Sequence, residues 1–262
     1  MKRILQTALA VANACIAPTG LRIASWSAPT RDFGAFIAHL RRAGITPRTV
    51  VDIGVAFGTP KLYSSLPDAK FFLVEPVPSC RPLLERLERQ IGATCFNVAA
   101  GAEDGEIDFF VHDDVSGSSA YRQWEGEALD GRRVRVPVRR LDAMIPLDIA
   151  RPCLLKIDAQ GAELDVLAGA ERLLSQVDIA IIETSFHQFR KGAPEIDQVI
   201  SAMAHRGFRC YEALEGHFRS LDGAMAQIDI AFVRDDSPLR SERAFFRPEQ
   251  AEVYARRTSA RK

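Results

Sequence analysis

The 262-residue sequence lacks the features that mark membrane, metal-bound and nucleic-acid-binding proteins. No apolar run approaches the length of about 20 residues that spans a bilayer. The five cysteines are scattered, without a Cys-x-x-Cys pair or a Cys/His metal spacing, which favours reduced thiols in a cytoplasm. Lys+Arg and Asp+Glu are equal at 34 each, so no overall field attracts polyanions. We therefore expect a cytoplasmic protein without a transmembrane segment, a metal site or a nucleic-acid partner.

The N-terminal segment superficially resembles a signal peptide, with two basic residues before an apolar stretch. Polar residues interrupt that stretch, and its apolar residues recur at helical spacing between residues 4 and 12. This pattern predicts an amphipathic helix that contacts the domain, a partner or a second copy of the chain. Residues 31 to 43 carry another helical stripe, and we interpret residues 1 to 47 as an N-terminal helical appendage.

From residue 48 the sequence alternates between short apolar runs and helical patterns, which is typical of an α/β fold with a doubly wound, mostly parallel sheet. The runs predict seven strands, which are residues 49–53, 70–74, 94–98, 153–157, 179–183, 208–212 and 228–233. Residues 101 to 141 interrupt the rhythm with two alternating runs around a serine-rich stretch, which predicts an inserted hairpin or cap. The main domain then covers residues 48 to 236, and residues 237 to 262 form a C-terminal tail.

Two of these strands are followed by the elements of a nucleotide-cofactor site. The run VVDIGVAFG, residues 50 to 58, places Gly54 and Gly58 after a buried strand, where a glycine lets a ligand approach the backbone. Glu75 ends the next strand about 20 positions beyond the glycine loop, the spacing of an acid that accepts hydrogen bonds from ribose hydroxyls. The third glycine of a nicotinamide fingerprint is missing, which counts against an oxidoreductase. A structural turn between two core strands is the alternative.

A second distinctive stretch, LLKIDAQGAELDVLAGAERLL, covers residues 154 to 174. A buried strand brings Lys156 and Asp158 to its carboxyl end, and Glu163 follows in the first turn of a helix. Because ligands of open α/β sheets bind outside the carboxyl ends of the strands, four acids are expected to face one crevice. These acids are Asp52, Glu75, Asp158 and Glu183.

With these motifs the sequence resembles the FkbM-like family of S-adenosylmethionine-dependent methyltransferases over roughly residues 48 to 234. The matching segments are VVDIGVAFG, VEP, NVAAG, RRLDAM, LKIDAQGAELDVLAGAE and IIETSF. The resemblance implies a Rossmann-like sheet of seven strands, one of them antiparallel near the C-terminus, with helices on both faces. Phe57 stands where the family usually has asparagine or tyrosine, and Thr59-Pro60 replaces a more usual helix start. These two departures from the family pattern put the substrate subclass in question more than the cofactor.

The resemblance also implies the cofactor, S-adenosyl-L-methionine, and the residues that hold it. Asp52, Gly54, Gly58 and Glu75 would bind the cofactor, and Asn97 would lie near its adenine, although a plain turn role suits Asn97 equally well.

The acceptor side is expected beyond Asp158. A neutral hydroxyl needs a base, for which Asp158 is the first candidate and His187 the second. Lys156, Glu163 and Glu183 are candidate substrate-binding residues. Each has a structural alternative, since Asp158 can cap a helix or pair with Lys156, Glu163 can complement a helix N-terminus, and a lone histidine is more often a surface residue.

We therefore expect a methyltransferase that O-methylates a hydroxyl of a saccharide or secondary metabolite. One alternative is a non-catalytic cofactor-binding protein that docks on a biosynthetic assembly through its first helix. Another is methylation of protein or nucleic acid, against which the neutral charge and the missing N/D-P-P-Y/F motif argue.

Overall fold

The computed structural model describes residues 11–13, 15–16, 23, 31–247 and 250–251. The helix expected between residues 4 and 12 lies almost wholly outside this part. The contact expected through the N-terminal helix and the domain boundaries therefore stay predictions. Within the described residues, no helix combines the length and apolarity that a membrane crossing requires.

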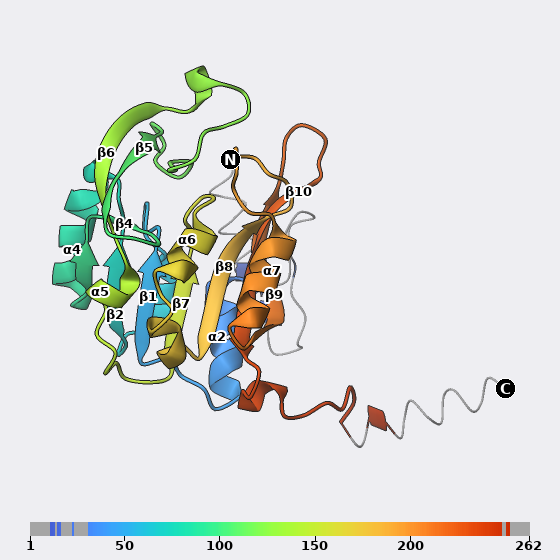
Figure 1. The fold of residues 1–262 in the computed structure, drawn as a ribbon. Coiled ribbons are helices and arrows are strands. Elements are labelled where there is room, and N and C mark those ends of the chain that lie inside the picture. The colour runs from blue at the N-terminus through green and yellow to red at the C-terminus, as the bar shows by residue number, and fades with distance from the viewer. Residues whose placement is uncertain (1–10, 14, 17–22, 24–30, 248–249, 252–262) are drawn as a thin grey trace.

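A seven-stranded sheet forms the centre of the protein, with the strand order β3-β2-β1-β7-β8-β10-β9 (Figure 1). Neighbouring strands from β3 to β8 pair in parallel, and β10 alone runs antiparallel to both of its neighbours. The predicted α/β fold, mostly parallel with one antiparallel strand near the C-terminus, is confirmed. The strands are β1 (Thr49–Ile53), β2 (Lys70–Val74), β3 (Thr94–Phe96), β7 (Cys153–Ile157), β8 (Ile179–Ser185), β9 (Phe208–Phe218) and β10 (Met225–Arg234).

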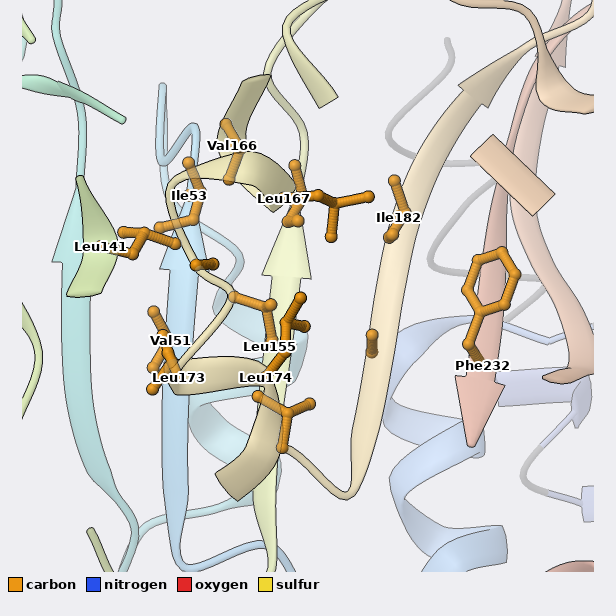
Figure 2. Packing of buried hydrophobic residues seen from close by; sticks show 14 of the residues in the cluster. Val51, Ile53, Leu141, Leu155, Val166, Leu167, Leu173, Leu174, Ile182 and Phe232 are labelled. Carbon is orange, nitrogen blue, oxygen red and sulfur yellow. The ribbon is translucent and has the colours of Figure 1, made fainter. Parts of the chain in front are cut away.

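Helices cover both faces of this sheet, and the central strands β1 and β7, which are mainly apolar, are buried along their whole length. On one face, α5 (Leu141–Met144), α6 (Glu163–Ala168), the 3₁₀ turn η4 (Leu173–Gln176) and α7 (Ile196–His205) pack on the strands. Figure 2 shows this cluster, in which Val51 and Leu155 from the sheet meet Leu141 and Val166 from the helices. Each such buried aliphatic side chain stabilises the fold by about 1.5–3 kcal/mol.

The opposite face is covered by α2 (Phe33–Arg42), α3 (Pro60–Ser65) and α4 (Arg81–Ile91), which follows the turn η2 (Pro78–Cys80). The Asp32 side chain begins α2 by accepting a hydrogen bond from the Ala35 N–H at 2.8 Å. The apolar stripe of α2 is buried against the sheet, so this helix belongs to the layer that covers the glycine loop. Tyr63 of α3 is buried in the same layer and reaches under that loop.

The segment between residues 99 and 139 builds a second, smaller sheet from β4 (Ala99–Ala100), β5 (Gly105–Val111) and β6 (Arg132–Arg139). β5 and β6 pair antiparallel, where the alternating pattern predicts a hairpin. This hairpin rises beyond the carboxyl ends of β1 and β7 (Figure 1). The loop that joins its strands, residues 112–131, contains the turn η3 (Glu127–Leu129) and is called the β5–β6 loop below.

Three expected elements end differently from their patterns. The strand expected at residues 94–98 ends at Phe96, because the Asn97 side chain bonds the backbone of the preceding loop. The helix expected at 162–174 ends at Ala168, because Gly169 packs so closely that a Cβ there would lie 2.0 Å from the Gly101 oxygen. The strand expected at 208–212 continues to Phe218, which makes β9 and β10 a long hairpin before the turn η5 (Pro238–Arg240).

Candidate active site

The glycine loop lies where the carboxyl ends of β1, β2 and β7 meet. The Gly54 N–H donates to the Val74 oxygen at 2.9 Å, and the Asp158 N–H donates to the Ile53 oxygen at 2.9 Å. Gly54 has φ +79°, and a Cβ there would lie 1.8 Å from the Asp158 carbonyl oxygen. Only glycine fits this position, because a side chain would collide with the adjoining strand end.

Glu75 faces the glycine loop from the end of β2. It is 3% exposed, and its two carboxylate oxygens accept hydrogen bonds from the Ala56 and Val77 N–H groups, each at 2.8 Å. Burial raises the pKa of Glu75, while these two backbone hydrogen bonds oppose the shift. A carboxylate has about four lone-pair sites, so Glu75 keeps capacity to accept hydrogen bonds from a ligand.

A largely apolar cavity, called the glycine-loop cavity, opens between this loop and the β5–β6 hairpin. Its walls include Gly54, Glu75, Val77, Ala100, Phe109 and Asp158. The hairpin thus closes the side of the cavity that faces away from the sheet. An apolar cavity beside a carboxylate at the end of β2 has the kind of lining that suits an adenosine.

Asp52 lies beneath the glycine loop and does not line this cavity. It is fully buried, and its Oδ2 accepts hydrogen bonds from the Tyr63 hydroxyl at 2.6 Å and the Thr59 hydroxyl at 3.1 Å. Its Oδ1 lies 3.6 Å from the Lys156 Nζ. Burial, then the Asp52 charge, raise the pKa of Tyr63. The contacts favour a role for Asp52 in holding the loop rather than in touching a ligand.

Asn97 occupies a comparable supporting position beside Glu75. Its Nδ2 donates to the Glu75 carbonyl at 2.7 Å and to the Val77 carbonyl at 3.2 Å. It is not among the residues that line the glycine-loop cavity. Of the two interpretations that the sequence leaves open, these contacts favour the turn role.

Beyond Asp158 the glycine-loop cavity meets a second one, called the acidic cavity. Its walls include Lys61, Lys156, Asp158, Glu183, Glu215 and Asp229. Lys156 is 4% exposed, and its Nζ lies 3.4 Å from the Asp158 Oδ2 as well as near Asp52. Burial by itself lowers the pKa of Lys156, but the surrounding carboxylates, Asp158 first, raise it above its usual range. Lys156 therefore lies within a set of carboxylates rather than open to a substrate.

Glu183 and Asp229 face each other across the β8–β10 pair. Burial raises the pKa of Glu183 well above its ordinary value and that of Asp229 to about 7. Glu183 Oε2 accepts hydrogen bonds from the side-chain amides of Gln160 at 2.6 Å and Gln227 at 2.7 Å. These amides satisfy one oxygen of a carboxyl group that is otherwise surrounded by negative charge.

A third opening, called the polar groove, continues from Asp158 toward the β5–β6 loop and the β9–β10 hairpin. Its walls include His112, Gln123, Gln160, Arg190, His217 and Gln227. The β5–β6 loop is fastened to the main domain on this side. Tyr121 donates from its hydroxyl to Asp165 at 2.7 Å, and Arg190 donates to the Gly117 carbonyl at 3.0 Å. The groove offers many donors and acceptors beside apolar atoms, and its lining is more polar than that of the glycine-loop cavity.

Besides Asp52 and Asn97, two further predicted site residues are not brought into these cavities. The Glu163 carboxylate is buried below the turn, where its Oε1 accepts from the Gly161 N–H at 2.9 Å, and burial raises its pKa to about 7. His187 packs its ring against Phe189, with 5.7 Å between centroids, and lines none of the three openings. Asp158 does not cap α6, whose N-cap is Ala162, and instead pairs with Lys156.

Four residues that the sequence analysis did not single out contribute to the site. They are Tyr63, Gln160, His217 and Asp229. Asp229 leaves a trace in the sequence, because it is an acid inside an apolar strand, between Ile228 and Ile230. Gln160 lies within the distinctive stretch of residues 154–174, although it was not singled out there, whereas Tyr63 and His217 carry no comparable local signal.

Comparisons with known proteins agree with this geometry. A family model described as "Methyltransferase FkbM domain" matches residues 52–210, more than half of the chain. A comparison with curated protein sequences finds no match.

Solved structures with a similar arrangement include two bacterial methyltransferases. Magnesium protoporphyrin IX methyltransferase (ChlM) from Synechocystis PCC 6803, with bound SAM, is 11% identical with a TM-score of 0.41, covering 77% of each chain. The N-methyltransferase NodS from Bradyrhizobium japonicum WM9 is 8% identical with a TM-score of 0.43, covering 77% of this chain and 93% of its own.

Proposed function

Since the chain belongs to the FkbM family of S-adenosyl-L-methionine-dependent methyltransferases, we propose that it transfers the methyl group to a hydroxyl of a saccharide or a similarly hydroxylated metabolite. One observation carries this proposal. Of the described residues, Asp158 alone lines the glycine-loop cavity, the acidic cavity and the polar groove. A carboxylate therefore stands where a cofactor space meets an acceptor space.

The residues of the glycine-loop cavity fit the cofactor. Gly54 permits close approach to the backbone, the apolar walls suit an adenine, and Glu75 offers unused lone pairs to the ribose hydroxyls. When bound, S-adenosyl-L-methionine supplies an electrophilic methyl group on a sulfonium. The protein supplies orientation, a base and exclusion of water. Asp52 and Asn97 act in this proposal by supporting the loops that carry Gly54 and Glu75.

Asp158 is the proposed general base. A neutral hydroxyl attacks poorly, and a carboxylate within hydrogen-bond reach that accepts its proton accelerates such a step by about 10²–10⁴-fold. One Asp158 oxygen contacts Lys156 at 3.4 Å and the other accepts from the Gln160 amide at 3.0 Å. The carboxylate is thus held in place while part of its surface remains open to the groove.

The polar groove supports an acceptor with several hydroxyl groups. Its walls carry amide, imidazole, guanidinium and carboxylate groups, which can bind several hydroxyl groups at once, beside the apolar surface of residues such as Phe189. Glu183 and His217 line both the acidic cavity and the groove, so they are placed to bind the parts of the acceptor next to the reacting hydroxyl. In this arrangement Lys156 and Glu163 support the site rather than touch the acceptor.

The test combines binding with turnover. Calorimetry measures S-adenosylhomocysteine binding, and methyl-labelled S-adenosyl-L-methionine is incubated with a panel of mono- and oligosaccharides. Asp158→Asn is expected to keep cofactor affinity but to lose at least about 10²-fold in kcat. The exposed Asp68→Asn serves as the matched control and is expected to behave as the wild type. Full activity of Asp158→Asn, or labelling of amines but of no hydroxyl compound, contradicts the proposal.

A further inference from the structure

Backbone strain concentrates around the glycine-loop cavity. Among the described residues, three that are not glycine have positive φ, namely Ala56 at 44°, Val115 at 64° and Gln160 at 50°. They come from three different segments of the chain, yet all three line this one cavity. Left-handed backbone conformations are unfavourable for side chains with a Cβ, and such residues gather where function requires them.

Gln160 combines this conformation with contacts to both acids of the acceptor side. Its Nε2 donates to the Asp158 Oδ1 at 3.0 Å and to the Glu183 Oε2 at 2.6 Å. Both hydrogens of the amide are therefore used, one for each carboxyl group. A neutral donor lies between two acids that would otherwise face each other directly.

The backbone of Gln160 is held from the other side of the cavity. The Ser119 hydroxyl, on the β5–β6 loop, donates to the Gln160 carbonyl at 2.6 Å. The Ser119 side chain is nearly fully buried, and its backbone pairs with Phe110 of β5. The left-handed turn at Gln160 is thus clamped by the hairpin that also covers the cofactor space.

The backbone alone does not explain a glutamine at this position. A glycine adopts φ near 50° without strain, and glycine already follows at Gly161 with φ +106°. What glutamine adds at the strained position 160 is a side chain that reaches Asp158. Lys156 holds one oxygen of Asp158 and Gln160 holds the other, from opposite sides of the carboxylate.

We propose that Gln160 is a positioning residue, which fixes the direction of the Asp158 carboxylate toward the acceptor and is itself held in place by Ser119 of the β5–β6 loop. This inference rests on the proposed function, in which Asp158 is the base. Gln160 itself exchanges no proton, because its amide only donates hydrogen bonds to the two acids.

Two variants separate positioning from stability. Gln160→Gly removes the amide and also relieves the strain, whereas Gln160→Met keeps the side-chain length and the strained backbone but lacks the donor. Both are expected to lower kcat by about 10²-fold, the effect of a misplacement of about 1 Å, with the affinity for S-adenosylhomocysteine changed less than about twofold. The melting temperature of Gln160→Gly is expected to equal or exceed that of the wild type.

The matched control is Gln176→Met, which changes a glutamine whose amide contacts only Ser175, and it is expected to leave kcat unchanged. Wild-type kcat in both Gln160 variants overturns the inference, as does a loss of kcat that follows a loss of melting temperature in Gln160→Gly. If the wild type binds cofactor but methylates no acceptor, the proposed function fails. Crystal structures of the wild type and of Gln160→Met then test separately whether Gln160 positions Asp158. A rotated Asp158 in Gln160→Met supports it, and an unmoved Asp158 overturns it.

Discussion

Replacing Lys156 with methionine tests the electrostatics under the site most directly. The substitution removes the ammonium that faces Asp52 at 3.6 Å and Asp158 at 3.4 Å. At an effective dielectric constant of about 20, each contact corresponds to an attraction of about 5 kcal/mol, which is offset in part by the desolvation of the ions. Without Lys156 the fully buried Asp52 charge keeps only two hydroxyl donors. We expect a loss of about 3–5 kcal/mol in the free energy of unfolding.

Urea denaturation measures this loss as a shift of the midpoint at unchanged slope. Lys61→Met is the matched control, because Lys61 also lies near two carboxylates, Asp32 at 3.1 Å and Glu215 at 3.3 Å, but its side chain is 60% exposed. Such a surface pair contributes at most about 1 kcal/mol. The double variant Asp52→Asn/Lys156→Met is expected to recover much of the loss, because it no longer buries an unpaired charge at Asp52. A loss below about 1 kcal/mol for Lys156→Met, or a double variant as unstable as the sum of the single ones, refutes the reasoning.

Three further outcomes are expected. Gly54→Ala places a Cβ 1.8 Å from the Asp158 oxygen and is expected to abolish S-adenosylhomocysteine binding in calorimetry. The control Gly44→Ala, at a similar positive φ in open space, is expected to lose only about 1–2 kcal/mol of stability and no affinity. Glu163 has a pKa raised from 4.5 to about 7 by burial, so the folded state binds its proton more tightly and stability falls as pH rises through this range. At 1.36 kcal/mol per pKa unit this amounts to about 3 kcal/mol, and Glu163→Gln is expected to match the wild type in thermal melts at pH 4 and to exceed it at pH 8. His187→Ala is expected to keep wild-type kcat, and a loss of more than about tenfold would restore His187 as a base candidate.

The fold follows from the sequence because its strongest signals are local. β1 and β7 are buried along their whole length, so each reads as a mainly apolar run with one charged residue near its end, and a glycine or an acid follows each run. What the pattern misses is set by contacts distant in sequence. The helix that begins at Glu163 stops at Ala168, and the Gly169 backbone that follows packs against Gly101, nearly seventy positions earlier. Gly169 is a local sign of a helix end, but its contact with Gly101 cannot be recognised from the sequence.

The site was predictable where it is built from parallel strands. Each parallel strand ends at the same edge of the sheet, so an acid that follows an apolar run is expected at that edge, and Glu75 and Asp158 line the glycine-loop cavity there. Asp52, within the last two residues of β1, and Asn97, just after β3, lie at the same edge but do not line this cavity, because the rule gives the edge of the sheet and not the direction of a side chain.

The rule for the carboxyl ends of parallel strands does not predict Asp229, because of the direction of its strand. β10 is antiparallel, so it brings its first half to the edge where its neighbours end, and Asp229 lies opposite Glu183 in the middle of a sequence run. To find it from sequence requires both the direction and the register of β10, and a register error of one residue would place it on the opposite face. His217 was missed for a different reason, because the sequence pattern ends this strand at residue 212, whereas β9 continues to Phe218 and carries His217 to its carboxyl end. Both residues lie outside the stretch of 52–210 that the family model matches, so this hairpin is where the chain's own acceptor preference is expected to reside.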